Sequence, residues 1–191
     1  MFNIVLFGPP GAGKGTQSQK IIQQYKLMHI STGDMLRAAI REQSPIGIEA
    51  QRYIDKGNLV PDEMVIDLIS KQLDEHHDIP GIVFDGFPRT TVQAKKLDEM
   101  LDHKGFPISL MLSLEVSFDE LLIRLINRGK DSGRADDQDE SIIRSRFDVY
   151  NKTTLPVMDY YKLQGKYKGI NGMGSINDIF KRICSTIDST L

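Results

Sequence analysis

Residues 8–16 read Gly-Pro-Pro-Gly-Ala-Gly-Lys-Gly-Thr, and no other stretch says more about the fold of this chain. The apolar run at 2–7 before it predicts a short buried strand, and residues 17–25 after it predict a helix. A glycine-rich loop between a strand and a helix start presents backbone N–H groups to an anion, and Lys14 adds a positive charge. The stretch therefore predicts a phosphate-binding loop.

This loop departs at one position from the pattern G-x-x-x-x-G-K-[ST], which is typical of nucleoside triphosphate sites. Gly8, Gly13 and Lys14 match the pattern, but Gly15 stands before the hydroxyl residue, Thr16. An ordinary Gly/Pro turn is the alternative interpretation. The flanking strand and helix favour a nucleotide site, although the loop alone does not indicate what happens to the phosphate.

Composition and charge limit the classes of protein to consider. The 191 residues are 40% hydrophobic and 26% charged, which predicts one globular domain over residues 1–191. A net charge of −2 gives no argument for nucleic-acid binding, and no apolar run approaches the roughly 18 residues that span a membrane. The single cysteine, Cys184, excludes an internal disulfide and a cysteine-rich zinc site. With no signal segment at Met1, we expect a cytoplasmic protein.

Short apolar runs alternate with longer amphipathic ones along the chain. Strands are expected at 4–7, 82–84, 109–114 and 167–170, with a further candidate at 27–30. Helices are expected at 17–25, 65–73, 91–103, 118–127 and 140–163, and a last helix follows Ser175. This alternation predicts an α/β fold with a parallel sheet covered by helices on both faces. The polar stretch 128–137 is expected to be a mobile lid without regular structure.

An acid and an arginine follow the predicted strand at 82–84. Asp85 stands at the end of this strand, beside the phosphate loop, where a carboxylate can hold Mg²⁺, usually through water. Arg89 suits a transferring phosphoryl group, because its planar fork binds phosphate in a bidentate way and keeps its charge. An ordinary strand-end aspartate and a solvated arginine are the alternatives, and the phosphate loop argues against both.

Further arginines are candidates for phosphate binding. Arg37 lies about one turn after Ser31-Thr32-Gly33-Asp34, a segment that is equally compatible with a simple helix cap. Arg124 and Arg128 lie four residues apart on one predicted helix, so an anion between them would relieve their repulsion; a solvated helix face is the alternative. The other candidates are Arg134 and Arg146.

Together these motifs resemble the adenylate kinase family of nucleoside monophosphate kinases, in its short-lid form, over nearly the whole chain. The resemblance is carried by Gly8 to Thr16, Ser31 to Asp34 with Arg37, Asp85 to Arg89 with Gln93, Ser132-Gly133-Arg134 with Asp136-Asp137, and Arg146 with Tyr150, Thr154 and Pro156. In this family a glycine between the lysine and the hydroxyl residue, as at Gly15, is normal. The short lid of the family carries no zinc-binding cysteines.

The resemblance implies a three-layer P-loop fold with five parallel strands in the order 2-3-1-4-5, an AMP-binding insertion at 31–60 and a short lid at 127–138. It implies ATP binding by Gly11, Ala12, Gly13, Lys14, Gly15, Thr16, Arg128 and Gly174. It implies AMP binding by Thr32, Arg37, Asn58, Leu59, Val60, Gly86, Phe87, Pro88, Arg89, Gln93, Arg134 and Arg146, with Thr32 and Gln93 reading the adenine. Catalysis is expected from Lys14, Arg89, Arg124, Arg128, Arg134 and Arg146. Mg²⁺ is expected at Asp85, with Thr16 as a second candidate ligand.

The reaction that the resemblance implies is reversible phosphoryl transfer, ATP + AMP to 2 ADP, with Mg²⁺ and without zinc. The expected partners are these nucleotides, with no nucleic acid, no membrane and a monomeric protein. A UMP/CMP kinase of the same fold is one alternative, disfavoured by Thr32 and Gln93, where such relatives usually carry alanine and asparagine. The other is a P-loop protein that binds nucleotide without transferring phosphate, which would not need arginines for two phosphate groups.

Overall fold

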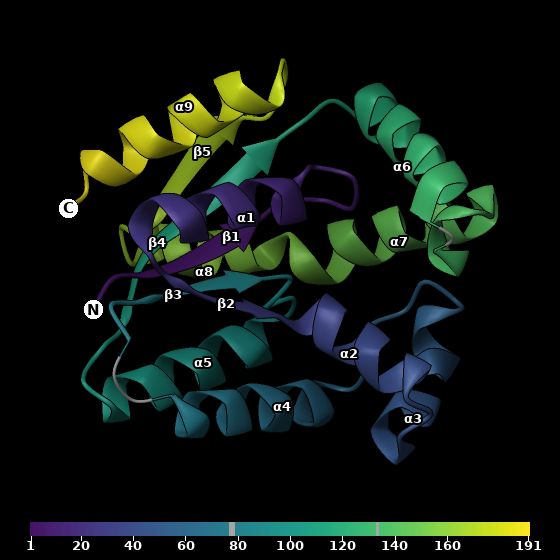
Figure 1. Cartoon of the computed structure of the whole chain (residues 1–191), viewed down its shortest axis with the longest axis horizontal. Helices are drawn as coiled ribbons and strands as arrows, with labels where there is room; N and C mark the ends of the chain where they lie inside the picture. Colours follow the sequence, from purple (N-terminus) through teal and green to yellow (C-terminus); the bar gives the residue numbers. More distant parts are fainter. Residues whose placement is uncertain (77–78, 133) are drawn as a thin grey trace.

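The structure is a computed structural model that describes residues 1–76, 79–132 and 134–191. Its middle layer is a five-stranded parallel sheet with the strand order β2-β3-β1-β4-β5 (Figure 1). The strands are β1 (Asn3–Phe7), β2 (Met28–Ser31), β3 (Ile82–Asp85), β4 (Ile108–Glu115) and β5 (Tyr167–Asn171). The predicted α/β fold class and strand order are confirmed, and each strand lies within one residue of its expected bounds.

Helices cover both faces of the sheet, because successive residues of a buried strand point to opposite sides. Val5 and Phe84 join one hydrophobic cluster with α2, α3, α4, α5 and α8, whereas Ile4 and Val83 join the other with α1, α6, α7 and α9 (Figure 1). These helices are α1 (Lys14–Tyr25), α2 (Thr32–Arg41), α3 (Pro45–Ile54), α4 (Asp62–Glu75), α5 (Thr91–His103), α6 (Phe118–Ser132), α7 (Glu140–Val149), α8 (Pro156–Leu163) and α9 (Ile176–Asp188). None of them, in the described ranges, is long and apolar enough to cross a membrane.

The carboxyl edge of the central strands positions the site. Leu6 of β1 pairs in register with Asp85 of β3, so Asp85 reaches the edge where the phosphate loop (residues 8–16) leaves β1. Within the sheet, β3 and β2 lie to one side of β1, and β4 and β5 lie to the other side. Ligands of open α/β sheets bind at such a reversal of strand order.

The single helix expected at 140–163 is wrong, because the structure divides it into α7, a π-helical turn at Tyr150–Thr154, and α8. Pro156 has no backbone N–H, and its ring would clash with the carbonyl group four residues earlier in a regular helix. The backbone widens instead, and the N–H of Leu155 donates to the carbonyl of Tyr150 at 2.8 Å. The turn places Tyr150 and Thr154 at a cavity wall.

The prediction that residues 128–137 lack regular structure is also wrong. Helix α6 continues to Ser132, and a 3-10 turn follows at Ala135–Asp137, while Gly133 lies outside the described residues. Gly129 permits this packing, because a Cβ atom there would lie 2.4 Å from the carbonyl oxygen of Asp137. Arg128 also holds the turn through its ion pair with Asp137. The predicted lid is thus largely helical.

Candidate active site

The phosphate loop wraps around the side chain of Lys14. Gly8, Gly11 and Gly13 have φ values of +144°, +83° and +91°, which side-chain-bearing residues rarely adopt. The ammonium group of Lys14 donates to the carbonyl oxygens of Gly8 at 2.7 Å and Pro9 at 3.0 Å. Burial lowers the pKa of Lys14 from its ordinary 10.5 to about 7, and nearby arginines act in the same direction. An anion in the loop would restore the charged form.

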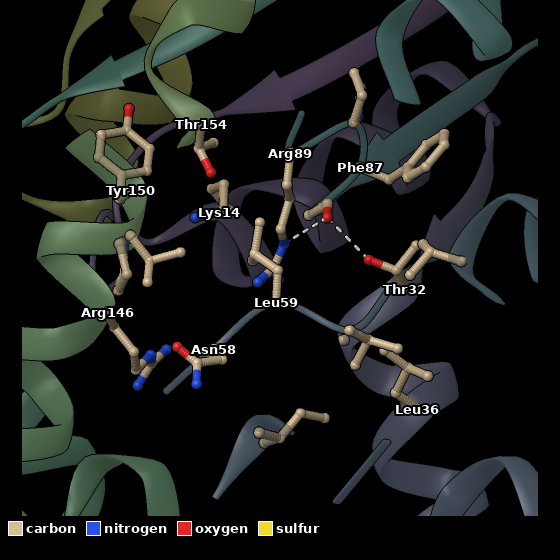
Figure 2. A pocket seen from close by; sticks show the side chains of 18 of the residues that line it. Lys14, Thr32, Leu36, Asn58, Leu59, Phe87, Arg89, Arg146, Tyr150 and Thr154 are labelled. Atoms are coloured by element: carbon tan, nitrogen blue, oxygen red, sulfur yellow. Dashed lines mark hydrogen bonds between the residues drawn. The ribbon is translucent and has the colours of Figure 1, made fainter. Parts of the chain in front are cut away.

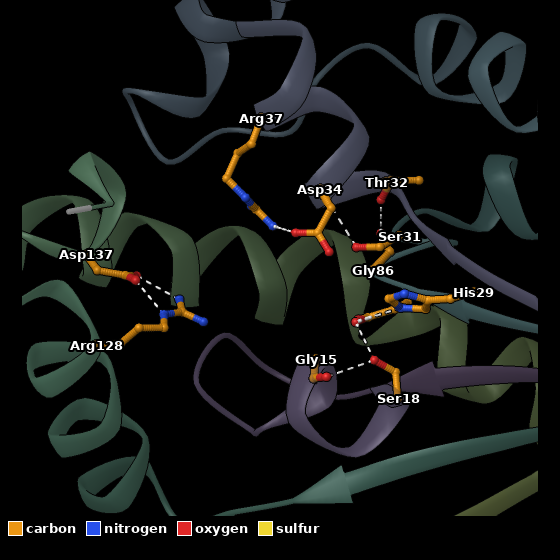
Figure 3. A network of polar contacts seen from close by, with 11 residues as sticks. Gly15, Ser18, His29, Ser31, Thr32, Asp34, Arg37, Gly86, Arg128 and Asp137 are labelled. Carbon is orange, nitrogen blue, oxygen red and sulfur yellow. Dashed lines mark hydrogen bonds and ion pairs between the residues drawn. The ribbon is translucent and has the colours of Figure 1, made fainter. Parts of the chain in front are cut away.

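Asp85 ends β3, and the side chains of Ser18 and His29, which Figure 3 shows next to each other, contact one of its oxygens. The hydroxyl of Ser18 donates to its Oδ2 at 3.3 Å, and His29 Nε2 lies 3.6 Å from the same atom. The carboxylate also lines a cavity that contains Gly15 and Thr16. The structure brings the two predicted metal-binding residues together, and the described residues contain no cluster of three or more His, Cys, Asp or Glu side chains suited to a metal ion.

We call this space the cationic cavity, because Lys14 and six arginines among the described residues line it. Those arginines are Arg37, Arg89, Arg124, Arg128, Arg134 and Arg146, all of which the sequence predicted for phosphate binding or catalysis. A second space, the apolar cavity, lies beside it and is lined by Leu36, Val60, Val65 and Phe87 among others. Lys14, Arg37, Arg89 and Arg146 line both, so they form a shared wall.

Arg89 occupies the middle of this shared wall, and its tip reaches into the space between Lys14 and Thr32 (Figure 2). Its Nε donates to the carbonyl oxygen of Gly86 at 2.7 Å. Arg89 forms no ion pair with the described side chains, although the charge of Arg146 lowers its pKa and the charge of Asp85 raises it. The surrounding protein removes water from the Arg89 guanidinium, and this desolvation, followed by the charge of Arg146, lowers its pKa to about 10, so it stays charged at neutral pH. Arg89 is therefore a charged group that can bind an anion without first leaving a carboxylate of the described residues.

Arg37 combines the two interpretations that its spacing left open. The hydroxyl of Ser31 accepts from the N–H of Asp34 at 3.3 Å and caps α2, as the simple cap requires. Arg37 nevertheless points into both cavities, and its guanidinium binds Asp34 Oδ1 at 2.6 Å (Figure 3). Burial disfavours the charge of Asp34, but the hydrogen bond and charge of Arg37 outweigh it and lower the pKa of that carboxyl.

The expected repulsion between Arg124 and Arg128 is relieved inside the protein. Arg124 binds Glu120 at 2.8 Å and also donates to the carbonyl oxygen of Gly172 at 3.1 Å. Arg128 binds both oxygens of Asp137, at 2.6 and 2.9 Å (Figure 3). Both arginines still line the cationic cavity, so an incoming anion would compete with these carboxylates.

Asp137 links the lid to α7. Its side chain is fully buried and binds Arg146 as well as Arg128, while Arg146 also binds Asp136 at 3.1 Å. Burial raises the pKa of Asp137, but the hydrogen bond and charge of Arg128, together with Arg146, lower it further than burial raises it. Sequence reasoning treated Asp137 only as part of a motif and missed that it neutralises two arginines.

Thr32 and Gln93, the predicted base-reading residues, both line the apolar cavity. The hydroxyl of Thr32 donates to the carbonyl oxygen of Gly86 at 2.9 Å (Figure 2). The Gln93 Oε1 atom accepts from the N–H of Arg89 at 2.7 Å, and its Nε2 donates to Asp62 at 2.8 Å. No sequence pattern joins Asp62 to Gln93, so this partner was missed.

Comparisons with known proteins agree with this geometry. Residues 6–166 match the family model described as adenylate kinase. The chain is 52% identical to the adenylate kinase of Bacteroides thetaiotaomicron over 188 residues, which cover 98% of this chain and 99% of that protein. It is 45% identical to the adenylate kinase of Flavobacterium psychrophilum over 189 residues, covering 99% of this chain and all of that protein. It is 44% identical to that of Porphyromonas gingivalis over 188 residues, covering 98% and 96% of the two chains.

The chain belongs to the adenylate kinase family. The predicted family and enzyme class are confirmed, since the match extends over nearly the full length of these relatives. The family's reaction transfers a phosphoryl group between two nucleotides, and the described residues line the cationic and the apolar cavity side by side, with volumes of about 1140 and 1070 Å³ including their open mouths.

Most of the residues predicted from the adenylate kinase resemblance line one of the two cavities. On the apolar side these are Thr32, Arg37, Asn58, Leu59, Val60, Gly86, Phe87, Pro88, Arg89, Gln93 and Arg146. On the cationic side they are Gly11, Gly13, Lys14, Gly15, Thr16, Asp85, Arg124, Arg128 and Arg134. Ala12 is buried, and Gly174, with φ of +103° between β5 and α9, lines neither cavity. The structure thus leaves the predicted role of Gly174 as a prediction.

Proposed function

We propose that this chain transfers the γ-phosphoryl group of ATP to AMP, reversibly, and so produces two molecules of ADP. The observation that carries this proposal is the shared wall of Lys14, Arg37, Arg89 and Arg146, because a group that passes between two nucleotides must lie where their sites meet. An oxygen of the AMP phosphate forms the new bond to the γ-phosphorus. The bond between the γ-phosphorus and the β–γ bridging oxygen of ATP breaks, and that oxygen leaves with ADP. The attacking oxygen is already anionic, so no general base is needed.

ATP is assigned to the cationic cavity. The amides of the phosphate loop and Lys14 would bind the β- and γ-phosphates, and Arg124 and Arg128 would approach them from α6. Gly174 would lie against the adenine. The carboxylate of Asp85 suits Mg²⁺, since its Oδ2 is held by Ser18 while the side chain still reaches the cavity. Asp85 would hold the metal ion through water, and the ion would supply charge neutralisation at the phosphates.

AMP is assigned to the apolar cavity, with its phosphate at the shared wall. Leu36, Val60 and Phe87 provide an apolar surface for the base, and Thr32 and Gln93 provide polar groups that orient it. Backbone around Asn58 to Val60 would complete this pocket. Arg37 and Arg89 would bind the AMP phosphate in the fork geometry that guanidinium groups favour.

The segments 31–60 and 127–138 are proposed to close over the two nucleotides. They carry Arg37 at one side of the shared wall and Arg128 and Arg134 at the other, and Arg146 lies between them on α7. Their closure would bring Arg134 and Arg146 to the transferring group and exclude water, which limits hydrolysis of ATP. We expect a cytoplasmic monomer, and light scattering of the purified protein would test the oligomeric state.

A product assay tests the function directly. The enzyme is incubated with ATP and Mg²⁺, and AMP, CMP, UMP or GMP is added in turn. We expect two ADP for each AMP consumed and little product from the other acceptors. Preferred transfer to a pyrimidine nucleotide would contradict the assigned roles of Thr32 and Gln93, and loss of ATP at the same rate without any acceptor would contradict transfer altogether.

A further inference from the structure

The carboxamide of Gln93 is hydrogen-bonded at both ends by groups of fixed polarity. Its Oε1 accepts from the backbone N–H of Arg89 at 2.7 Å, and its Nε2 donates to the carboxylate of Asp62 at 2.8 Å. An N–H can only donate and a carboxylate can only accept. A carboxamide turned by 180° would face the N–H with a donor and the carboxylate with an acceptor. The two neighbours therefore define one orientation of the amide.

One of these bonds follows from the start of α5, and the other does not. Thr90 is the N-cap of α5 and accepts from the N–H of Gln93 at 3.1 Å, as in a capping box, while Gln93 Oε1 reaches back to the N–H of Arg89, one residue before the N-cap. A glutamate at position 93 would satisfy that capping role through its acceptor oxygens. It could not donate to Asp62, which lies 31 residues earlier. The capping requirement thus leaves the bond to Asp62 unexplained.

Asp62 is itself held for this contact. It is the first residue of α4, and the Thr90 hydroxyl donates to both of its oxygens at 3.1 Å. Its carboxylate thus joins the first turn of α4 to the first turn of α5. Gln93 is only 2% exposed, yet it lines the apolar cavity. The remaining N–H of Nε2 and the remaining lone pair of Oε1 are the groups that it can offer to a ligand there.

We propose that Asp62 is a positioning residue that holds the Gln93 amide in one orientation and thereby selects the base of the acceptor nucleotide. This inference rests on the proposed function, which assigns the acceptor base to the apolar cavity. A base that pairs with the fixed amide must present a donor to Oε1 and an acceptor to Nε2. Adenine does so with its amino group and N1, whereas hypoxanthine and guanine present an acceptor and a donor in the same places. Cytosine shares the pattern of adenine, so the size of the pocket must exclude it.

The test compares AMP with inosine monophosphate, whose base has nearly the size and shape of adenine and the opposite polarity. The main variant is Asp62→Asn, because an asparagine amide can turn to accept or to donate, so that only the N–H of Arg89 still favours one orientation of Gln93. The matched control is Glu63→Gln, which removes an exposed charge from the same first turn of α4. Asp62→Ser is a second variant, since serine is well tolerated at a helix start and its hydroxyl can also donate or accept.

Two readouts are used: kcat/KM for each acceptor, and binding of each monophosphate by calorimetry without ATP. We expect the wild-type enzyme and Glu63→Gln to prefer AMP by about 100-fold or more. In Asp62→Asn and Asp62→Ser this preference should fall at least about tenfold, with KM for ATP unchanged. Melting curves show whether each variant is folded, and either folded variant is sufficient for the test.

The outcomes separate this inference from the proposed function. An AMP preference that stays at the wild-type value in a folded Asp62 variant would overturn the inference while leaving phosphoryl transfer intact. A wild-type enzyme that binds both monophosphates equally would overturn it as well. If the wild-type enzyme transferred no phosphoryl group but its binding preference for AMP depended on Asp62, the proposed function would fail and the positioning role would stand.

Discussion

The cationic cavity and the apolar cavity hold their polar side chains in different ways. Around the cationic cavity, Arg37, Arg128 and Arg146 are paired with carboxylates at or below 3.1 Å. Around the apolar cavity, Thr32 and Gln93 are hydrogen-bonded mainly to backbone groups that no ligand would displace. Phosphate must therefore replace internal acids when it binds, whereas the base meets groups that are already oriented. Displacing these carboxylates lowers the affinity for phosphate, but in the empty protein the same carboxylates neutralise the cluster of cations. The groups already oriented around the base give specificity.

Arg89, by contrast, forms no ion pair with the described side chains, and its removal should have the largest effect. Replacing Arg89 with alanine is expected to lower kcat by about 10³-fold or more, because a guanidinium at the transferring phosphoryl group can contribute this much. The fold should remain, since the side chain makes one hydrogen bond to the Gly86 carbonyl. Steady-state kinetics and circular dichroism measure both.

The matched control for this variant is Arg144→Ala. Arg144 is 63% exposed and pairs with Glu140 on the outer side of α7. Its removal should leave kcat within about twofold of the wild-type value. A folded Arg89→Ala enzyme with similar turnover would show that the shared wall does not contain the reacting group.

The base side can be tested with Gln93→Leu, which removes the oriented amide at nearly constant size. We expect KM for AMP to rise by about 10- to 100-fold, while KM for ATP changes by less than about twofold. Gln72→Leu on α4 is a suitable control, because the Gln72 side chain donates to the exposed Glu75 and lines neither cavity. Equal increases of both KM values would instead indicate a general loss of structure.

The strands and the phosphate loop could be predicted from the sequence because their determinants are local. An apolar run such as residues 4–7 and a glycine-lysine loop carry their signal within a few residues. The order of the strands could not be predicted from periodicity, and it came with the family resemblance. Most predicted site residues came the same way, and all of them except Ala12 and Gly174 line at least one of the two cavities.

Contacts between distant residues were beyond the reach of sequence patterns. Asp62 and Gln93 meet across two helices, and Asp137 neutralises Arg128 and Arg146 only because the 3-10 turn folds back on α6. The polar composition of residues 128–137 predicted a loop, because composition does not reveal these ion pairs between distant residues. Charged side chains are compatible with helix as well as loop, and tertiary ion pairs decide between them.

The charge of Lys14 provides a smaller effect that depends on pH. Its pKa is about 7 in the empty protein, and phosphate binding requires the charged form. Above pH 7 the empty protein has lost this proton, so ATP must bind together with a proton, and its affinity should fall about fivefold from pH 7 to pH 8.

Calorimetry at pH 8 in buffers of different ionisation enthalpy measures this proton. We expect uptake of about 0.9 proton per ATP in the absence of Mg²⁺, as a pKa of about 7 requires. The control is Lys14→Arg, which stays charged and should bind without uptake. Equal proton uptake by both proteins would place the titrating group elsewhere.

The smallest expected effect is a gain of affinity in Asp34→Asn. Asp34 is 63% exposed and competes with phosphate for Arg37, so its removal should tighten AMP binding by a factor of about 1.5 to 5. The gain should shrink at high ionic strength. Asp159→Asn removes a similar pair with Lys162 away from the site and should have no effect. Weaker AMP binding in Asp34→Asn would contradict the competition between carboxylate and phosphate.

The central claim is that one phosphoryl group crosses the shared wall from one nucleotide to the other. ATP labelled only at the γ-phosphorus, mixed with AMP, Mg²⁺ and the enzyme for short times, tests it most directly. We expect the label in the β-phosphate of the ADP formed from AMP, one label for each AMP consumed, with almost none as free phosphate. Label released as free phosphate, at a rate that does not depend on AMP, would contradict it.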